Sequence, residues 1–263
     1  MDILEIAKSA IDPIPFICAS DNGKTINATL PILEAKVDSL PDGMDAIIAT
    51  GDLQGVDIQN RQLLGYRLAE VLARSSDRGL IPPREKTGII LSGDLWAKAN
   101  RRGGVGDVRG VWLAMASRFS WVAGVGGNHD RFGNSYHEMK EFKSRARIHY
   151  LDGEIAEVNG WRLAGISGII GKATKYFRRP EKEFIKLINN LVKKSPDILI
   201  LHEGPGDPDN KLIGRESIRK ALIHTQNLVT ICGHSHWKVP MTKLPLGAAV
   251  VNVDGRAIVF RKK

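Results

Sequence analysis

Two histidines one residue apart, His234 and His236, follow a short apolar run and a glycine in the segment "ICGHSHW". A strand that ends in glycine and turns two imidazoles into one space suits a metal ion, because neutral imidazole is a common transition-metal ligand. Taken alone, such a pair is more often a set of surface or hydrogen-bonded loop histidines. The pair therefore predicts a metal site only if the chain supplies matching carboxylates.

Polar residues also follow other apolar segments of the chain. They are Asp52 after "IIATG", Asp94 after "IILSG", Asn128 and His129 in "VGGNHD", and His202 at the end of "LILH". Ligands bind at the carboxyl edge of strands in open α/β sheets, so these residues could converge on one site. Carboxylate, amide oxygen and imidazole together suit Mn²⁺, Fe or Zn²⁺. Either aspartate alone could instead cap a helix, since aspartate after glycine is a common N-cap.

Short β-rich runs that alternate with segments of helical period predict an α/β fold. Strands are expected at residues 15–20, 45–50, 88–93, 120–125, 197–202 and 228–233. Helices are expected where apolar residues recur every three or four positions, at residues 28–40, 60–75, 108–119 and 180–194. Hairpins are expected around "NG" in residues 153–168 and around "DG" in residues 238–262.

Composition limits the classes of protein to which the chain can belong. Its 263 residues are 43% hydrophobic and contain no internal repeat, which predicts a single domain over residues 1–263. The net charge of +9 should attract polyanions such as nucleic acid and nucleotides. No apolar stretch approaches the roughly 18 residues of a membrane span and no secretory signal is present, so we expect no membrane span and a cytoplasmic location. Cys18 and Cys232 lie in apolar runs and are expected to be buried thiols.

The order of these polar residues resembles that of the calcineurin-like metallophosphoesterase superfamily. Its signature of D-x-H, G-D, G-N-H-D/E, a lone H and G-H-x-H is matched across residues 52 to 236. The resemblance implies two mixed β-sheets flanked by helices and a site for two divalent metal ions, with Mn²⁺ favoured and Fe or Zn²⁺ as alternatives. One ion would be held by Asp52, Gln54, Asp94 and His236, and the other by Asp94, Asn128, His202 and His234.

Gln54 departs from the family signature, which usually has histidine at this position. A glutamine carbonyl is a weaker donor than imidazole, so affinity at the first ion should be lower and tilted toward hard ions such as Mn²⁺. A rival alignment takes "ASDNG", with Asp21, as the first motif. We reject it because it would leave Asp94 without a role.

The resemblance implies a metal-dependent phosphoesterase in which a hydroxide that bridges the two ions attacks phosphorus. His129 would then protonate the leaving-group oxygen, and Arg131 could contact a non-bridging oxygen. The positive charge favours a nucleotide or nucleic acid as substrate, and hence a phosphodiesterase. The alternatives are a phosphomonoesterase acting on proteins or small molecules, and a metal-poor protein-interaction module, which only Gln54 favours.

A basic segment rich in aromatic residues is the candidate contact for nucleic acid. Phosphate contacts and base stacking from such a segment can hold a single strand, although a plain solvated loop would have the same composition. The segment runs from Lys172 to Arg179 and contains Lys172, Lys175, Tyr176, Phe177, Arg178 and Arg179. His137, His149 and His224 match no motif and are expected to be surface or structural residues.

Overall fold

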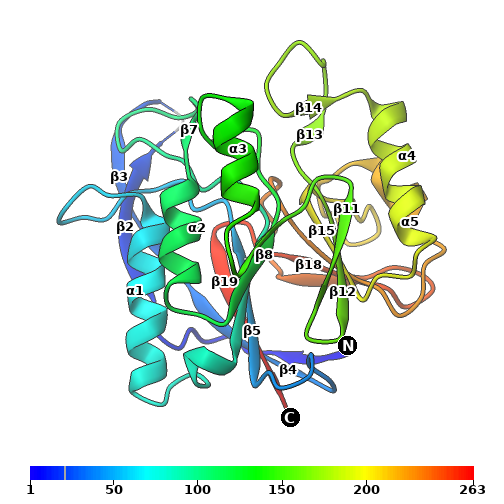
Figure 1. Cartoon of the computed structure of the whole chain (residues 1–263), viewed down its shortest axis with the longest axis horizontal. Coiled ribbons are helices and arrows are strands. Elements are labelled where there is room, and N and C mark those ends of the chain that lie inside the picture. Colours follow the sequence, from blue (N-terminus) through cyan, green and yellow to red (C-terminus); the bar gives the residue numbers. More distant parts are fainter. Residues whose placement is uncertain (21) are drawn as a thin grey trace.

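The computed structural model describes residues 1–20 and 22–263, so Asp21 and the alignment that we rejected lie outside the described residues. Two mixed β-sheets pack against each other, and helices cover the outer face of each (Figure 1). This arrangement confirms the predicted fold class. No helix in the described part of the chain is long and apolar enough to cross a membrane.

The first sheet lies between the second sheet and helices α1, α2 and α3. Its strands, in spatial order, are β1 (Ile3–Ile6), β4 (Ile32–Val37), β19 (Arg256–Lys262), β5 (Ala46–Gly51), β6 (Thr87–Leu91), β8 (Trp121–Gly124) and β10 (Ile148–Tyr150). The helices are α1 (Leu64–Asp77), α2 (Arg109–Ala116) and α3 (Tyr136–Lys143). α1 buries Leu64, Leu68 and Leu72, which are four residues apart and therefore share one face.

The second sheet lies between the first sheet and helices α4 (Glu181–Val192) and α5 (Glu216–Leu222). Its strands, in spatial order, are β11 (Glu154–Val158), β12 (Trp161–Ile166), β15 (Ile198–Glu203), β16 (Val229–Gly233), β18 (Ala249–Asn252) and β17 (Met241–Lys243). Short pairs complete the fold: β2 (Ile14–Ala19) with β3 (Thr25–Leu30), β7 (Gly106–Asp107) with β9 (Asp130–Arg131), and β13 (Ile169–Ile170) with β14 (Arg178–Arg179). A 3-10 turn, η1 (Arg84–Lys86), precedes β6.

The central strands consist mostly of consecutive apolar residues, because both of their faces are covered. Every residue of β5, β6 and β15 is buried. In β5, Ile47 faces the layer between the two sheets, whereas Ile48 faces the layer beneath the helices. Parallel strands buried on both sides characteristically lose the apolar–polar alternation, and this explains why these strands were predictable.

The helix predicted at residues 28–40 is wrong. This segment forms the end of β3 and all of β4, separated by Pro31, whose ring and missing amide hydrogen disfavour a helix interior. β4 pairs with β19 in parallel and with β1 in antiparallel orientation. The apolar residues of this segment are also spaced as in a helix, but hydrogen bonds to β1 and β19 make it a strand.

The two predicted hairpins have different outcomes. Asn159 and Gly160 have φ values of 50° and 76° and join β11 to β12 as a hairpin, as the "NG" signal predicted. The "DG" prediction is wrong, because Asp254 and Gly255 connect β18 of the second sheet to β19 of the first sheet. The antiparallel partner of β18 is β17 instead. The chain thus crosses between the sheets at Asp254.

Candidate metal centre

The predicted ligands lie where strands of both sheets end. Asp52 follows β5, Asp94 comes shortly after β6, and His234 follows β16. These residues have φ values of 50°, 53° and 65°, in the left-handed region that residues other than glycine seldom adopt. Such backbone strain is concentrated at functional sites in proteins. Turns held in this conformation therefore mark the strand ends as a candidate site.

Asp94, His202 and His234 form a compact group whose donor atoms all lie within 4.8 Å of one another. His202 Nε2 is 3.3 Å from Asp94 Oδ2, and both side chains are buried. His202 Nδ1 is 2.9 Å from the Ser92 carbonyl oxygen, so Nδ1 carries the proton that is donated to this oxygen. That bond fixes the ring with Nε2 toward the group, as in metal-binding histidines whose second nitrogen binds a carbonyl.

Two buried polar atoms at this group have no hydrogen-bond partner among the described residues. They are His202 Nε2 and Asn128 Oδ1, and Asn128 is only 7% exposed. Nearly all buried polar atoms in proteins are partnered. Asn128 Oδ1 carries a lone pair that a cation accepts, and His202 Nε2 offers one once its proton is lost. The donors predicted for the second ion therefore fit a divalent metal.

The charges of this group are strongly coupled. Burial alone would lower the pKa of His202, but the negative charges of Asp94 and Asp52 outweigh it and raise this pKa to about 10. Burial would raise the pKa of Asp94, but the charge of His202 prevails and lowers it to about 2. Burial and the nearby charge of His202 lower the pKa of His234 to about 4. The site thus holds an ionised carboxylate beside one protonated and one neutral imidazole.

The donors predicted for the first ion are less closely gathered. Gln54 Nε2 donates to Asp94 Oδ2 at 2.9 Å, so its amide nitrogen, rather than its carbonyl, meets the shared carboxylate. Asp52 Oδ2 accepts the backbone N–H of His234 at 2.8 Å. His236 is mostly exposed and lies outside the compact group. The structure therefore joins Gln54 and Asp52 to the second set of donors but leaves His236 at the rim.

Asp254 is a site carboxylate that sequence reasoning missed. Its Oδ2 lies 3.4 Å from His236 Nδ1, and a β-bridge to Gly51 places it beside the end of β5. Burial raises the pKa of Asp254, and burial together with the charges of Asp254 and Asp94 raises the pKa of Asp52 well above its usual value. The signal was present in "VVNVDG", an aspartate after a strand, but the "DG" was assigned to a hairpin turn.

Glycines allow the carboxylates to approach the neighbouring turns. A Cβ on Gly127 would lie 2.0 Å from Asp94 Oδ1, and a Cβ on Gly233 would lie 2.0 Å from Asp52 Oδ2. Asp94 Oδ1 instead accepts the backbone N–H of His129 at 2.9 Å. The glycines of "GGNHD" and "CGHSH" are thus required for close packing around the candidate ligands.

Asp130 is a second residue that sequence reasoning missed. It is fully buried and accepts the backbone N–H groups of Leu95, Trp96 and Gly127 at 2.8, 3.2 and 2.9 Å. Burial and the charge of Asp94 raise its pKa to about 6. Asp130 therefore ties the turn after β6 to the turn after β8, which carry Asp94 and Asn128.

His129 is held in one orientation by the loop before β7. Its Nδ1 lies 2.6 Å from the carbonyl oxygen of Gly104, which leaves Nε2 3.9 Å from Asp94 Oδ2. Gly103 and Gly104 have φ values of 72° and 90°, a conformation that glycine adopts without strain. His129 thus presents Nε2 beside the candidate ligands, as a proton donor at this site requires.

Arg131 and the segment from Lys172 to Arg179 lie on one side of the "GGNHD" turn. The Arg131 guanidinium lies 5.8 Å from the centre of the Tyr176 ring, which stacks on Phe177 at 4.5 Å. Phe177 also packs against Phe132, and Arg179 forms an ion pair with Asp152. Phe177 and Arg179 therefore hold the segment in place. Of its basic and aromatic side chains, the exposed ones are Lys172, Lys175 and Tyr176.

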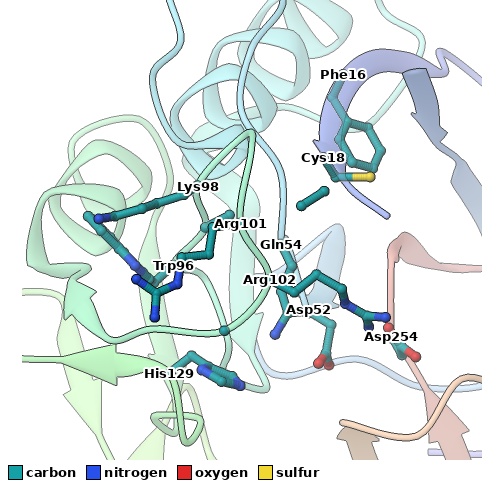
Figure 2. A pocket seen from close by; sticks show the side chains of 13 residues that line it. Phe16, Cys18, Asp52, Gln54, Trp96, Lys98, Arg101, Arg102, His129 and Asp254 are labelled. Carbon is teal, nitrogen blue, oxygen red and sulfur yellow. The ribbon is translucent and has the colours of Figure 1, made fainter. Parts of the chain in front are cut away.

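A pocket of about 180 Å³ lies beside Asp52 and His129 (Figure 2). Its lining comes from β2, from the turn after β5, from the loop between β6 and β7, from the turn after β8, and from the connection between β18 and β19. The lining residues include Phe16, Cys18, Gln54, Trp96, Lys98, Arg101, Arg102 and Asp254. Cys18 and Cys232 are free thiols, and only Cys232 is fully buried.

Comparison with known proteins gives one family. The family model described as calcineurin-like phosphoesterase matches residues 14–238. A search of curated proteins gives no match. Among solved structures, the crystal structure of a hypothetical protein from Thermus thermophilus resembles the chain with a TM-score of 0.46 and 15% identity. The match covers 80% of this chain and 76% of that one.

Proposed function

The chain belongs to the calcineurin-like phosphoesterase family, and from this premise we propose that it is a hydrolase of phosphate esters that uses two divalent metal ions. The observation that supports the proposal best is the compact group of Asp94, His202 and His234. Asn128 Oδ1 offers a buried lone pair at this group, and His202 Nε2 offers another when its proton is released. A structural ion pair between Asp94 and His202 would not require an unpartnered asparagine beside it.

Asp94, Asn128, His202 and His234 would hold one ion, and Asp94 would be shared with a second ion at Asp52, Gln54 and His236. The mixture of carboxylate, amide and imidazole donors favours Mn²⁺. Bound ions of this kind neutralise charge on a phosphoryl group and lower the pKa of water. His236 would ligate through Nε2, because its Nδ1 faces Asp254, the arrangement of a histidine oriented by a carboxylate.

His129 would transfer a proton to the leaving-group oxygen from Nε2. The carbonyl oxygen of Gly104 holds Nδ1, so the ring cannot turn Nε2 away from the site without losing this bond. A positioned histidine contributes about 10²- to 10⁴-fold to a rate as a general acid. Arg131 lies over Tyr176 and would need to leave this ring to contact a phosphoryl oxygen.

For the substrate we propose a nucleotide or a nucleic acid. The net charge of +9 and the basic side chains around the pocket support an anionic substrate that extends beyond the reacting phosphate. A metal-poor interaction module is the second candidate. It is favoured by the position of His236 at the rim and by the amide nitrogen of Gln54 on Asp94.

Asp94→Asn is the variant that tests the metal-dependent reaction, with Asp209→Asn on the exposed surface as its control. We expect the wild type and the control to bind two equivalents of Mn²⁺ and to hydrolyse bis(p-nitrophenyl) phosphate. Asp94→Asn should lose both metal and turnover, because its amide cannot supply the shared negative charge. Metal content is read by elemental analysis and folding by circular dichroism. Full occupancy and turnover in Asp94→Asn would refute the shared-ligand assignment, and a wild type that binds no metal would support the interaction module.

A further inference from the structure

We propose that the pocket beside His129 binds a second phosphate, located on the leaving-group side of the reacting phosphate. The proposal rests on the proposed function, since it takes His129 as the residue beside the leaving group. The substrate class that follows is a phosphoanhydride, in which the leaving group itself begins with a phosphate. Lys98 and Arg101 are the residues assigned to this second phosphate.

Among the described residues, Lys98 and Arg101 have no acidic partners. Both side chains are exposed, and neither forms an ion pair with any described residue. By contrast, Arg109, Arg179 and Arg215 are each paired with carboxylates at 2.6 Å. A backbone bridge between Lys98 and Arg101 brings the two residues side by side. Two adjacent cations at the wall of a pocket, with no ion pair to any residue that the structure describes, are suited to a phosphate.

These cations lie on the side of His129. Figure 2 shows Lys98, Arg101 and His129 on one side of the pocket, opposite Asp52 and Asp254. The same loop that carries the two cations also supplies the carbonyl oxygen of Gly104 to His129 Nδ1. The loop therefore orients the proton donor and places positive charge next to the group that receives the proton.

Trp96 is a rigid part of the same wall. Its indole Nε1 is buried and has no hydrogen-bond partner among the described residues, although a buried indole N–H usually finds one. The ring is fixed, because it packs against Gly106, where a Cβ would lie 2.3 Å from ring atoms. The backbone N–H of Trp96 is held by Asp130.

The size of the pocket favours a phosphate over a nucleoside. Its volume of about 180 Å³ is below the ~300–1,000 Å³ of pockets that enclose whole drug-sized ligands. A phosphate joined directly to the reacting one needs less room than a nucleoside followed by its next phosphate. A phosphoanhydride therefore fits better than an oligonucleotide, in which a sugar separates consecutive phosphates.

The reaction balances with water as the second substrate. The oxygen of water forms a bond to the reacting phosphorus, and the bond from that phosphorus to the bridging oxygen of the anhydride breaks. The bridging oxygen leaves with its electron pair as part of the second phosphate. His129 Nε2 can deliver one proton to the departing oxygen, and a proton of the attacking water restores the histidine. The other proton of the water stays on the newly formed phosphate or leaves to solvent according to pH.

The test compares three proteins on three substrates. The proteins are the wild type, the Lys98→Ala/Arg101→Ala double variant, and a Lys182→Ala/Lys186→Ala control on the exposed face of α4. The substrates are diadenosine triphosphate, a thymidine dinucleotide with a 5′-phosphate, and bis(p-nitrophenyl) phosphate, which has no second phosphate. All assays use the Mn²⁺-loaded enzyme. Binding of adenosine 5′-(α,β-methylene)diphosphate is measured in parallel by calorimetry at constant free Mn²⁺.

We expect kcat/KM of the double variant on diadenosine triphosphate to fall by ~10- to 100-fold more than on bis(p-nitrophenyl) phosphate, as the loss of charged hydrogen bonds implies. The dissociation constant of the methylene analogue should rise by a similar factor, and the α4 control should match the wild type in every measurement. Equal losses on both substrates, or unchanged binding of the analogue, would overturn the proposal. A larger relative loss on the dinucleotide than on diadenosine triphosphate would assign the second phosphate to nucleic acid and overturn the phosphoanhydride. A wild type inactive on all three substrates would contradict the proposed function itself.

Discussion

Binding of Mn²⁺ at the group of Asp94, His202 and His234 should release a proton from His202. An imidazole nitrogen must be unprotonated to ligate a metal, whereas the charges of Asp94 and Asp52 raise the pKa of His202 to about 10. With the pKa of His234 near 4 and that of Asp94 near 2, the other two donors are already deprotonated at neutral pH. His202 is therefore the residue of this group whose proton competes with the ion.

The size of the effect follows from that pKa. Below pH 10, the unprotonated fraction of His202 increases about tenfold for each unit by which the pH is raised. The apparent affinity for Mn²⁺ should therefore rise about tenfold per pH unit between pH 6 and 8. The sign is fixed, because raising the pH removes the competing proton and tightens binding. At pH 7 the proton would weaken binding by about three powers of ten relative to the fully deprotonated site.

Calorimetric titration of chelator-treated protein between pH 6 and 8, in buffers of different ionisation enthalpy, gives both the affinity and the number of protons released. His224→Gln is the matched control, because His224 is an exposed histidine outside the site. It should give the same slope as the wild type. Imidazole NMR of the chelator-treated protein should show His202 protonated through pH 8. A flat affinity profile, or a neutral His202 at pH 7, would refute the reasoning.

Two further outcomes are expected at the first ion. Gln54→His should tighten binding of the more weakly held Mn²⁺ and raise the preference for Zn²⁺, because imidazole is a stronger and softer donor than an amide; identical affinities in competition titrations would show that Gln54 is not a ligand. Asp254→Asn should weaken the same ion by ~10- to 100-fold, as the loss of a carboxylate that orients a ligating histidine does, while Asp209→Asn should leave it unchanged. Equal metal affinities in Asp254→Asn and the wild type would separate Asp254 from the site.

The strands that carry the candidate ligands were predictable because their sequences allow few alternatives. β5, β6 and β15 are short, mostly apolar strands, and both of their faces are covered. Residues 28–40 were assigned the wrong structure because Leu33 and Val37 also satisfy a helical period. That segment becomes strand through its pairing with β19, more than 200 residues later in the chain. Pairing over such a distance leaves no local signal.

Helices α3 and α5 were not predicted, for a different reason. α3 buries only Phe142, so its apolar period is weak. Its start nevertheless carries a local signal, because Ser135 Oγ accepts the backbone N–H of Glu138, the S-x-x-E pattern of a capping box. α5 begins without a side-chain cap and spans only Glu216–Leu222. Capping residues would have found α3, whereas α5 had no such signal.

The residues of the candidate site also differ in whether the sequence alone predicts them. Ligands in contiguous motifs were named from the sequence, because each motif pairs a strand end with a residue that binds metals. Asp254 was missed because its local sequence is that of a turn, and its role appears only when β18 and β19 separate into different sheets. The pocket beside His129 was missed as well. Its wall combines Phe16, Arg101 and Asp254, three residues that no sequence spacing relates.

The hydrogen bonds among the strand-end turns show why these residues can be both strained and well placed. The backbone N–H of Asp52 donates to the carbonyl oxygen of Gly93, which links the turn after β5 to the turn after β6. Asp52 Oδ2 accepts from His234 and so reaches the turn after β16 in the other sheet. A left-handed residue costs about 1–3 kcal/mol and persists only where its surroundings over-determine it. Here the candidate ligands themselves supply those bonds, so a substitution at Asp52 should loosen the contact between the sheets as well as the metal site.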